Sequence, residues 1–296
     1  MQKLSDIDFS KFKAAMFDYD GTLTEKGEWI IDSDLANRMG ELLNAGFPIA
    51  VCTGRQVGSF AKRFGPTLRM IRENFGDEAA GRLYLLGENG SVGYEFSGKA
   101  GLEDKEEGWQ MFFKADWPAE IPKEKFEAGL VELLGDKVEF LTHLVPIVLA
   151  PIGRMDMKIE DVYKASAEVY RIAHKYVEEF EVAGGGSALD HLHLGDSGLG
   201  VLICPAKGDK DSAIRVFYEF LGLGEDEECR KIMVVGDSPH REGNDYYFLN
   251  GRYGTAFSVG TPPEDGVQWP IVVRDDDGKT VMNSRGTLHL LNKLPF

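Results

Sequence analysis

The chain lacks the features that would place it among membrane, secreted or repetitive proteins. It has no apolar run long enough to cross a membrane, no low-complexity segment, and only three cysteines in 296 residues. Cys52 and Cys204 lie within apolar, strand-like runs, which favours buried thiols in a reducing compartment over a disulfide framework. The first residues also lack the apolar centre of a signal peptide. We therefore expect a soluble, cytoplasmic protein.

Positive charge is scarce as well. The chain has 33 Lys and Arg residues against 49 Asp and Glu residues, which gives a formal net charge of −16. This excess repels phosphate backbones and anionic lipids, so we expect neither nucleic acid nor a membrane as a partner. A small anionic substrate would need cations placed close to it. Whether the protein is a monomer or a homodimer stays open.

A pair of aspartates follows the first apolar run of the chain, Ala14-Ala15-Met16-Phe17. Side chains alternate along a strand, so Asp18 and Asp20 leave its end on one face, and Gly21 allows a sharp turn beside them. Two carboxylates this close stay ionised only if a cation lies between them or one holds a proton. The alternative interpretation is an ordinary acidic turn, because Asp and Gly both favour turns.

The order of expected elements indicates one domain interrupted by another. Strand and helix signals alternate over the first hundred residues, which predicts a parallel sheet with crossover helices. In this part a helix begins near Ser33, and helical material over 56–74 is interrupted by Gly65-Pro66. Amphipathic helices and paired strands follow, and the parallel pattern resumes at Val201 to Cys204.

We therefore predict an α/β protein with a Rossmann-like parallel-sheet core and an inserted α+β cap domain. The core is expected to comprise residues 1–104 and 200–296, and the cap residues 105–199. Such a length is sufficient for two domains that each bury a core.

Polar residues follow four of the expected core elements, at the edge where open α/β sheets bind ligands. These residues are Asp18 with Asp20, Thr53, Lys210 and Asp237. Hydrolysis of a phosphate monoester needs a nucleophile, a proton donor and fixed positive charge, because the uncatalysed reaction is so slow that enzymes accelerate it up to about 10²¹-fold. Asp18 is the candidate nucleophile, forming an aspartyl phosphate, and Asp20 is the candidate acid and base.

The remaining residues supply oxygen ligands and cations. Asp237, Asp18 and the main-chain carbonyl of Asp20 form a hard-oxygen site suited to Mg²⁺. Thr53 and Lys210 would complete a phosphate clamp; taken alone, they fit a helix N-cap and a solvated charge equally well. Lys207 is an alternative to Lys210, which is favoured because it directly precedes a helix at the sheet rim.

These motifs resemble the four motifs of the haloacid dehalogenase-like (HAD) superfamily of phosphatases and phosphotransferases. The insert between Thr53 and Lys210 is similar to the type C2 cap of subfamily IIB. Within that group, residues 236–245 resemble the last motif of eukaryote-type phosphomannomutases, and Ser258-Val259 with Pro263-Glu264-Asp265 is a further similarity to these enzymes. The resemblance covers the whole chain.

The resemblance also implies roles for residues that the spacing alone does not assign. Gly54 and Asn244 would contact the phosphate together with Thr53 and Lys210. Asp245 would join Asp18, Asp20 and Asp237 at the metal. In the cap, Arg154 would grip a substrate phosphate and Asp190 would hold sugar hydroxyls.

The chain departs from the mutases at two cap positions. His143 stands where they place another phosphate-gripping arginine, and Val148 stands at a nearby polar position. Thr53-Gly54-Arg55 is more similar to the phosphatases. A mutase must hold a bisphosphate while it reorients and must keep water away from the aspartyl phosphate. Because His143 replaces an arginine that would bind the distant phosphate, the mutase alternative is weakened.

We therefore expect a Mg²⁺-dependent phosphatase that hydrolyses a small phosphorylated sugar or polyol through an aspartyl phosphate. One alternative is a phosphomannomutase-like hexose phosphomutase, and another is a catalytically silent sugar-phosphate-binding protein of the same fold. A transport ATPase is excluded by the lack of membrane spans. His191 and His193 invite a zinc hypothesis, but a polar strand face from which one of them points at the substrate is favoured.

Overall fold

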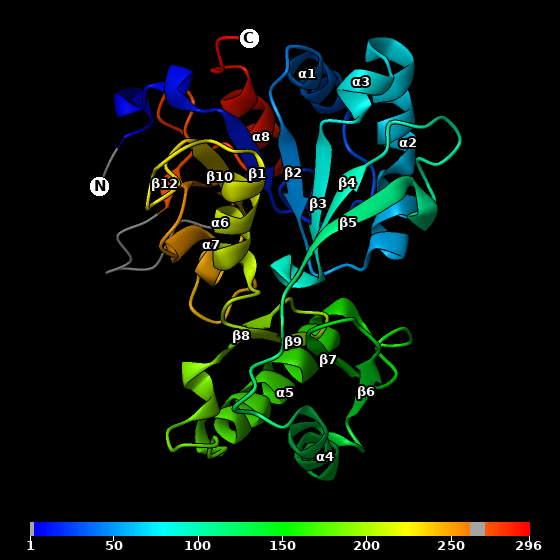
Figure 1. Ribbon diagram of the computed structural model, residues 1–296, viewed down its shortest axis with the longest axis vertical. Coiled ribbons are helices and arrows are strands. Elements are labelled where there is room, and N and C mark those ends of the chain that lie inside the picture. Colours follow the sequence, from blue (N-terminus) through cyan, green and yellow to red (C-terminus); the bar gives the residue numbers. More distant parts are fainter. Residues whose placement is uncertain (1–2, 261–269) are drawn as a thin grey trace.

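The computed structural model of the chain describes residues 3–260 and 270–296 and shows two lobes, each built on its own sheet (Figure 1). The larger lobe, the core domain, contains an eight-stranded sheet, and the smaller lobe, the cap, contains a four-stranded sheet. The motif Pro263-Glu264-Asp265 lies outside the described residues. None of the described helices is long and apolar enough to span a membrane.

The core sheet has the strand order β12-β11-β10-β1-β2-β3-β4-β5. The six strands from β12 to β3 are parallel, whereas β4 and β5 are antiparallel to their neighbours. The strands are β1 (Ala14–Phe17), β2 (Ile49–Cys52), β3 (Leu83–Gly87), β4 (Val92–Phe96), β5 (Trp109–Lys114), β10 (Ile232–Gly236), β11 (Thr255–Ser258) and β12 (Ile271–Val272). The predicted α/β class with a parallel-sheet core is confirmed.

Helices cover both faces of this sheet. The central strands β1, β2 and β10 are buried along their whole length, as expected for strands packed on both sides. Because side chains alternate along β1, Ala15 and Phe17 pack on one face and Ala14 and Met16 on the other. The first face carries α1 (Ser33–Asn44), α2 (Val57–Phe75), α3 (Asp77–Ala80) and α8 (Asn283–Leu291), and the second carries α6 (Lys210–Phe220) and α7 (Tyr246–Asn250).

The cap sheet is antiparallel, with the strand order β6-β7-β9-β8. Its strands are β6 (Val138–Leu141), β7 (Ile147–Pro151), β8 (Leu192–Asp196) and β9 (Val201–Pro205). One face packs against α4 (Lys123–Leu134) and α5 (Ile159–Glu179). The other face carries Leu141, Val148, Leu202 and Cys204 and lies toward the core, since a Cβ on Gly54 would be 3.1 Å from Leu202.

Single turns of 3-10 helix complete the fold. They are η1 (Leu4–Asp6), η2 (Phe9–Lys11), η3 (Glu88–Gly90), η4 (Glu106–Gly108) and η5 (Ala188–Asp190). The turn η3 directly follows β3, so it lies at the edge of the core sheet that faces the cap.

Two strands lie in a different sheet from the one predicted. The expectation that Val201 to Cys204 resumes the parallel core is wrong, because β9 pairs antiparallel with β7 and β8 in the cap. Conversely, β5 falls within the segment assigned to the cap but pairs with β4 in the core sheet. A short buried strand reads as an apolar run in either sheet, so its sequence does not name its partners. We propose that the cap begins after Lys114 and ends after Pro205.

Two helix details also differ from expectation. Gly65-Pro66 does not interrupt the second helix, because α2 continues through Pro66. A proline inside a helix removes one amide donor and crowds the preceding turn, at a cost of about 3 kcal/mol. Burial of Phe64 and Leu68 on either side of Pro66 helps to offset this cost. The first helix is capped by Asp32, whose side chain accepts a hydrogen bond from the Asp34 amide, and Ser33 is the first helical residue.

Candidate active site

The carboxyl ends of β1, β2 and β10 meet at the edge of the core sheet that faces the cap. Phe17 is paired with Val51 on β2 and with Val235 on β10, so the residues that follow these strands lie side by side. The Asp18 amide donates to the Val235 carbonyl at 2.9 Å, which continues the ladder into the site. The sheet therefore brings Asp18, Thr53 and Asp237 together from three separate parts of the chain.

A buried lysine links two of the aspartates. Lys210, the first residue of α6, donates from Nζ to Asp18 Oδ1 and to Asp245 Oδ1, both at 2.6 Å. Its side chain is only 1% exposed. Lys207 is exposed, so Lys210 is the lysine that reaches Asp18.

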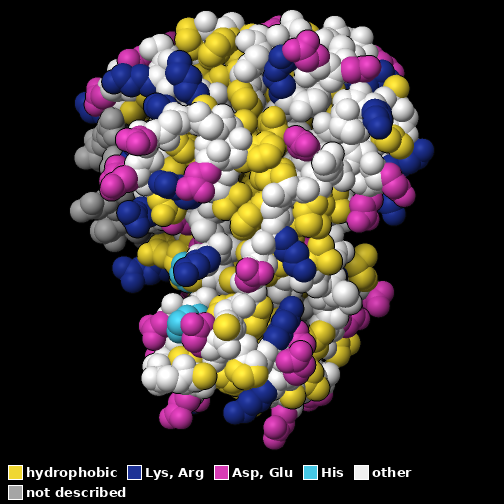
Figure 2. Space-filling view, viewed as in Figure 1, with side chains coloured by type: hydrophobic (Ala, Val, Ile, Leu, Met, Phe, Trp, Pro, Cys, Tyr) yellow, Lys and Arg dark blue, Asp and Glu magenta, His cyan; other side chains and the backbone are white. Residues whose placement is uncertain are grey.

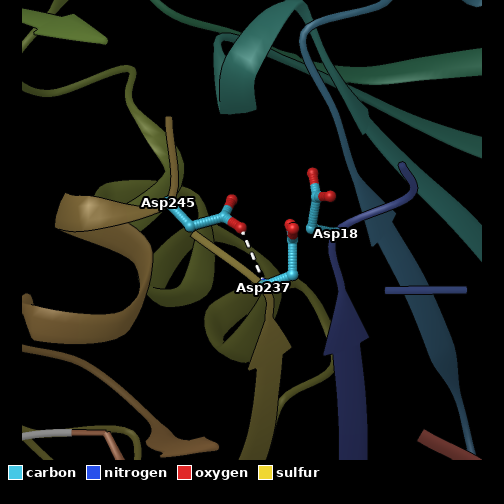
Figure 3. A group of neighbouring side chains, drawn as sticks. All are labelled: Asp18, Asp237 and Asp245. Carbon is cyan, nitrogen blue, oxygen red and sulfur yellow. Dashed lines mark hydrogen bonds between the residues drawn. The ribbon is translucent and has the colours of Figure 1, made fainter. Parts of the chain in front are cut away.

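Three carboxylates gather at the same point. Asp18, Asp237 and Asp245 each offer an oxygen within 4.8 Å of the others, and Figure 3 shows them converging from β1, β10 and the loop before α7. Asp245 Oδ2 also accepts the amides of Asp237 at 3.1 Å and Ser238 at 3.2 Å, which holds the loop closed around the cluster. Among the described residues, this is the group that could hold a metal ion, and neither His191 nor His193 belongs to it.

Glycines make room for the cluster. A Cβ on Gly21 would lie 2.8 Å from Asp237 Oδ2, and Gly21 also has a φ of +80°, which favours glycine. A Cβ on Gly236 would lie 2.8 Å from Asp245 Oδ2. The backbone can approach the carboxylates this closely only without side chains at these two positions.

The electrostatics of the cluster favour a divalent cation. Burial, with the nearby charge of Asp245, raises the pKa of Asp18 well above its usual value and that of Asp237 to about 7. Burial alone would lower the pKa of Lys210, but Asp18 and Asp245 outweigh it and raise that pKa. One ammonium group cannot neutralise three carboxylates. Hard carboxylate oxygens are the ligands that Mg²⁺ prefers, so the residues present fit this ion.

Asp20 is held outside the cluster. The Arg55 guanidinium donates from one nitrogen to both carboxylate oxygens of Asp20, at 2.7 Å each. The Asp20 side chain is 51% exposed, whereas the Asp18 side chain is 9% exposed. The Asp18 carboxylate is thus buried against Lys210, and the Asp20 carboxylate faces solvent beside the cluster, as suits a group that exchanges protons.

The predicted phosphate-binding residues lie around the cluster. Thr53 is buried, and its hydroxyl accepts the Arg55 amide at 3.4 Å. Gly54 lies beneath Leu202 of the cap. Asn244 lines a cavity of about 10 Å³ together with Lys210, and its Oδ1 is buried without a hydrogen-bond partner.

The three predicted cap residues have contacts within the cap itself. His143 Nδ1 lies 3.4 Å from the Leu141 carbonyl, and Arg154 donates to the Leu199 carbonyl at 3.5 Å. Asp190 is exposed, and its carboxylate accepts the Ser187 amide at 3.3 Å, which caps the turn η5. Their roles toward a substrate remain predictions.

Two residues at the site were not assigned a role from the sequence. The sequence indicates Arg55 only as part of Thr53-Gly54-Arg55, and no local pattern predicts its contact with Asp20. Glu88 Oε2 accepts the amides of Leu144 at 2.8 Å and Val145 at 3.0 Å, so this core residue fastens the turn between β6 and β7. No local signal marks these contacts, because Glu88 lies 56 positions before Leu144 and 57 positions before Val145.

Comparison with solved structures identifies the fold. IMP-nucleotidase from Plasmodium falciparum, with IMP bound, is similar over 96% of this chain and 68% of its own, with 14% identity and a TM-score of 0.62. A protein from Plasmodium vivax described as HAD/COF-like matches over 96% of both chains, with 14% identity and a TM-score of 0.59. A haloacid dehalogenase-like hydrolase from Bacteroides thetaiotaomicron matches over 96% of this chain and 99% of its own, with 14% identity and a TM-score of 0.53.

No protein-family model matches the sequence, and no curated protein matches it significantly. The similarity to these solved structures is therefore a similarity of fold at low sequence identity. The chain has the fold of HAD-like hydrolases, a parallel-sheet core with a cap domain, as the motifs around Asp18, Thr53, Lys210 and Asp237 predicted.

Proposed function

We propose that the protein is a Mg²⁺-dependent phosphatase that transfers the phosphoryl group of a small phosphorylated metabolite first to Asp18 and then to water. The observation that carries this proposal is the contact of the Lys210 ammonium with Asp18 and Asp245, directly beside Asp237. With Lys210 and a bound divalent cation beside it, such a buried carboxylate would keep the negative charge that nucleophilic attack on phosphorus requires. The HAD-like fold supports the same chemistry.

In the first step, Asp18 attacks phosphorus and the bond from phosphorus to the leaving oxygen breaks. One carboxylate oxygen of Asp18 forms the new bond, and Lys210 holds the carboxylate in place through its contact with Oδ1. Asp20 gives a proton to the leaving oxygen, which departs as an alcohol. Thr53 and Lys210 bind the phosphoryl oxygens and offset the charge that develops on them.

In the second step, water replaces Asp18 on phosphorus. Asp20, now ionised, takes a proton from the water as it attacks, and inorganic phosphate and free Asp18 are formed. Asp18, Asp237 and the main-chain carbonyl of Asp20 would hold Mg²⁺, with Asp245 completing the acidic group. The ion would neutralise charge on the phosphoryl oxygens.

The cap favours hydrolysis over a mutase reaction. A hexose bisphosphate intermediate would need a second cationic site away from Asp18. The four cap strands contain no lysine or arginine, and Arg154, which follows β7, donates to the Leu199 carbonyl within the cap. The face of the cap sheet toward the core carries Leu141, Val148, Leu202 and Cys204 instead. We propose a substrate with a single phosphate, and a phosphorylated sugar or polyol remains our expectation for its class.

A panel of phosphorylated metabolites tests this function. Sugar phosphates, polyol phosphates and nucleoside monophosphates, IMP among them, are incubated with the protein and Mg²⁺, and free phosphate is measured. We expect phosphate release from one substrate class, its loss on chelation, and a drop of at least about a thousandfold in Asp18→Asn. Phosphate release that persists in Asp18→Asn would contradict the proposal. If no compound releases phosphate, the alternative of a catalytically silent sugar-phosphate-binding protein is favoured.

The mutase alternative is separated in the same assay. Mannose 1-phosphate is incubated with and without a hexose bisphosphate, and both free phosphate and the isomeric sugar phosphate are measured. Isomer formation without free phosphate would overturn the phosphatase assignment.

A further inference from the structure

A histidine of the cap is bound by two residues of the core. His193, on β8, has its Nδ1 2.6 Å from Asp209 Oδ2. Its ring also stacks on Tyr247 of α7, with the centroids 3.8 Å apart and the planes 2° from parallel. This histidine is therefore fixed both by a polar contact and by a ring contact across the boundary between the lobes.

Asp209 connects this contact to the catalytic lysine. It is the N-cap residue of α6, and its Oδ1 accepts the Ser212 amide at 2.8 Å. Its Oδ2 contacts His193 Nδ1. One oxygen of this buried carboxylate therefore caps the helix α6, and the other binds the cap. Lys210 is the next residue in the chain, and the position of Asp209 sets where that side chain starts.

The rest of β8 is close to the same part of the core. The Asp196 amide donates to the Glu242 carbonyl at 3.0 Å, and a Cβ on Gly195 would lie 3.3 Å from Asn244. Figure 2 shows the smaller lobe packed directly beneath the larger one. In this arrangement Asp18 is 6% exposed, and the cavity beside Lys210 has only about 10 Å³. Because Asp18 is almost fully covered in this arrangement, we expect the cap to move away from it when a substrate binds.

We propose that His193 is a positioning residue: by binding Asp209 it holds the cap in the docked arrangement and places Lys210 against Asp18. The role in docking follows from contacts alone, whereas the effect on catalysis rests on the proposed phosphatase function. A direct contact of His193 with substrate would be a different role, and kinetics distinguish the two.

Cys204 reports on docking without any need for activity. It is 1% exposed, faces the core, and accepts a hydrogen bond from Asn89 Nδ2 at 3.6 Å on Sγ. Cys52, on β2, is fully buried inside the core domain. Cap opening would expose Cys204 but not Cys52, whereas global unfolding would expose both.

The first test is alkylation by N-ethylmaleimide, with the labelled cysteines located by peptide mass spectrometry. His193→Phe retains a ring against Tyr247 but removes the contact with Asp209, and His191→Phe is the matched control two residues earlier. We expect Cys204 to be labelled roughly ten- to a hundredfold faster in His193→Phe, with Cys52 unchanged. The control should match the wild type. Unchanged labelling of Cys204, or a parallel rise at Cys52, would overturn the proposal.

The second test is kinetic and uses the substrate found in the metabolite panel. If His193 positions Lys210, His193→Phe lowers kcat about tenfold or more and changes KM by less than about threefold. His193→Asn restores an amide donor near the position of Nδ1, so it should recover part of kcat and slow the labelling of Cys204. A rise in KM with unchanged kcat would assign His193 to substrate binding and contradict the positioning role.

The two tests separate this inference from the proposed function. If no compound releases phosphate but Cys204 labelling responds as expected, the docking role stands and the phosphatase assignment fails. If phosphate is released through Asp18 but labelling does not respond, the docking role fails alone.

Discussion

The ammonium group of Lys210 lies 2.6 Å from a carboxylate oxygen of Asp18, although the two residues are 192 positions apart in the chain. Both side chains are buried, and Asp245 shares the same ammonium group. Removing one partner from such a group leaves uncompensated buried charge, which costs far more than the net gain from forming the pair. The contact is therefore expected to matter for stability as well as for catalysis.

Lys210→Met tests this expectation. Loss of the ammonium leaves Asp18 and Asp245 buried without their cation, so the free energy of unfolding at neutral pH should fall by about 3–5 kcal/mol in urea denaturation. Part of this loss should be recovered at lower pH, where the carboxylates take up protons. Lys207→Met is the control, and because Lys207 is exposed its effect should be within about 0.5 kcal/mol. Equal effects of the two substitutions would refute the special position of Lys210.

Arg55 is expected to align the proton donor. Arg55→Met frees Asp20, so hydrolysis of an alkyl phosphate, whose leaving oxygen needs a proton, should slow about ten- to a hundredfold. Hydrolysis of p-nitrophenyl phosphate should change by only a few fold, because its leaving group departs without a proton. Arg69→Met removes a different arginine, which lies on α2 and forms an ion pair of 3.7 Å with Asp104, and serves as the control. A uniform loss with both substrates would indicate that Arg55 acts on the phosphate and not on Asp20.

Without a divalent ion, the ionisation of Asp18 and Asp237 should lower the free energy of unfolding as the pH rises. Burial, followed by the charge of Asp245, raises the pKa of Asp237 from 3.8 to about 7, and Asp18 shifts in the same direction. The folded state then binds more protons than the unfolded state between about pH 4 and pH 7. The stabilisation is complete below pH 4 and is lost as the pH rises through 7, by up to about 4 kcal/mol for Asp237.

Urea denaturation at pH 5 and pH 8, with EDTA or with Mg²⁺, measures this dependence. We expect lower stability at pH 8 in EDTA and a much smaller difference in Mg²⁺, because a bound cation favours the ionised carboxylates. Asp237→Asn should reduce the difference seen in EDTA. If stability in EDTA rises from pH 5 to pH 8, the carboxylates are not perturbed as described.

Gly21→Ala should affect the metal site more than the fold. A Cβ at this position would lie 2.8 Å from Asp237 Oδ2, and the φ of +80° is strained for alanine. We expect a loss of about 1–2 kcal/mol in the free energy of unfolding and a higher Mg²⁺ concentration for half-maximal activity. Gly27→Ala has a similar φ of +86° but open space around it, so it should share the loss of stability without the change in Mg²⁺ requirement.

The sequence predicted the core of the site because the chemistry lies at strand ends. Asp18, Thr53 and Asp237 each directly follow a buried apolar strand, and parallel strands end at one edge of their sheet. Lys210 was recognised from its place at the start of a helix. No knowledge of side-chain directions was needed for these residues.

The cap was harder to predict for physical reasons. β9 is as apolar as a core strand, and only its pairing with β7 and β8 places it in the cap. His193 and Asp209 are 16 positions apart and lie on different domains, so no local sequence pattern predicts their contact. The directions of Arg154 and Asp190 likewise depend on how the cap loops pack.

The formation of a phosphoryl ester on Asp18 is the central claim, and chemical trapping tests it most directly. The protein is mixed with its substrate and Mg²⁺, quenched in acid and reduced with borohydride, which converts an aspartyl phosphate to homoserine. Peptide mass spectrometry should then find homoserine at position 18, only with both substrate and Mg²⁺, and none in Asp18→Asn. Homoserine at another position, or none while phosphate is still released, would contradict the account.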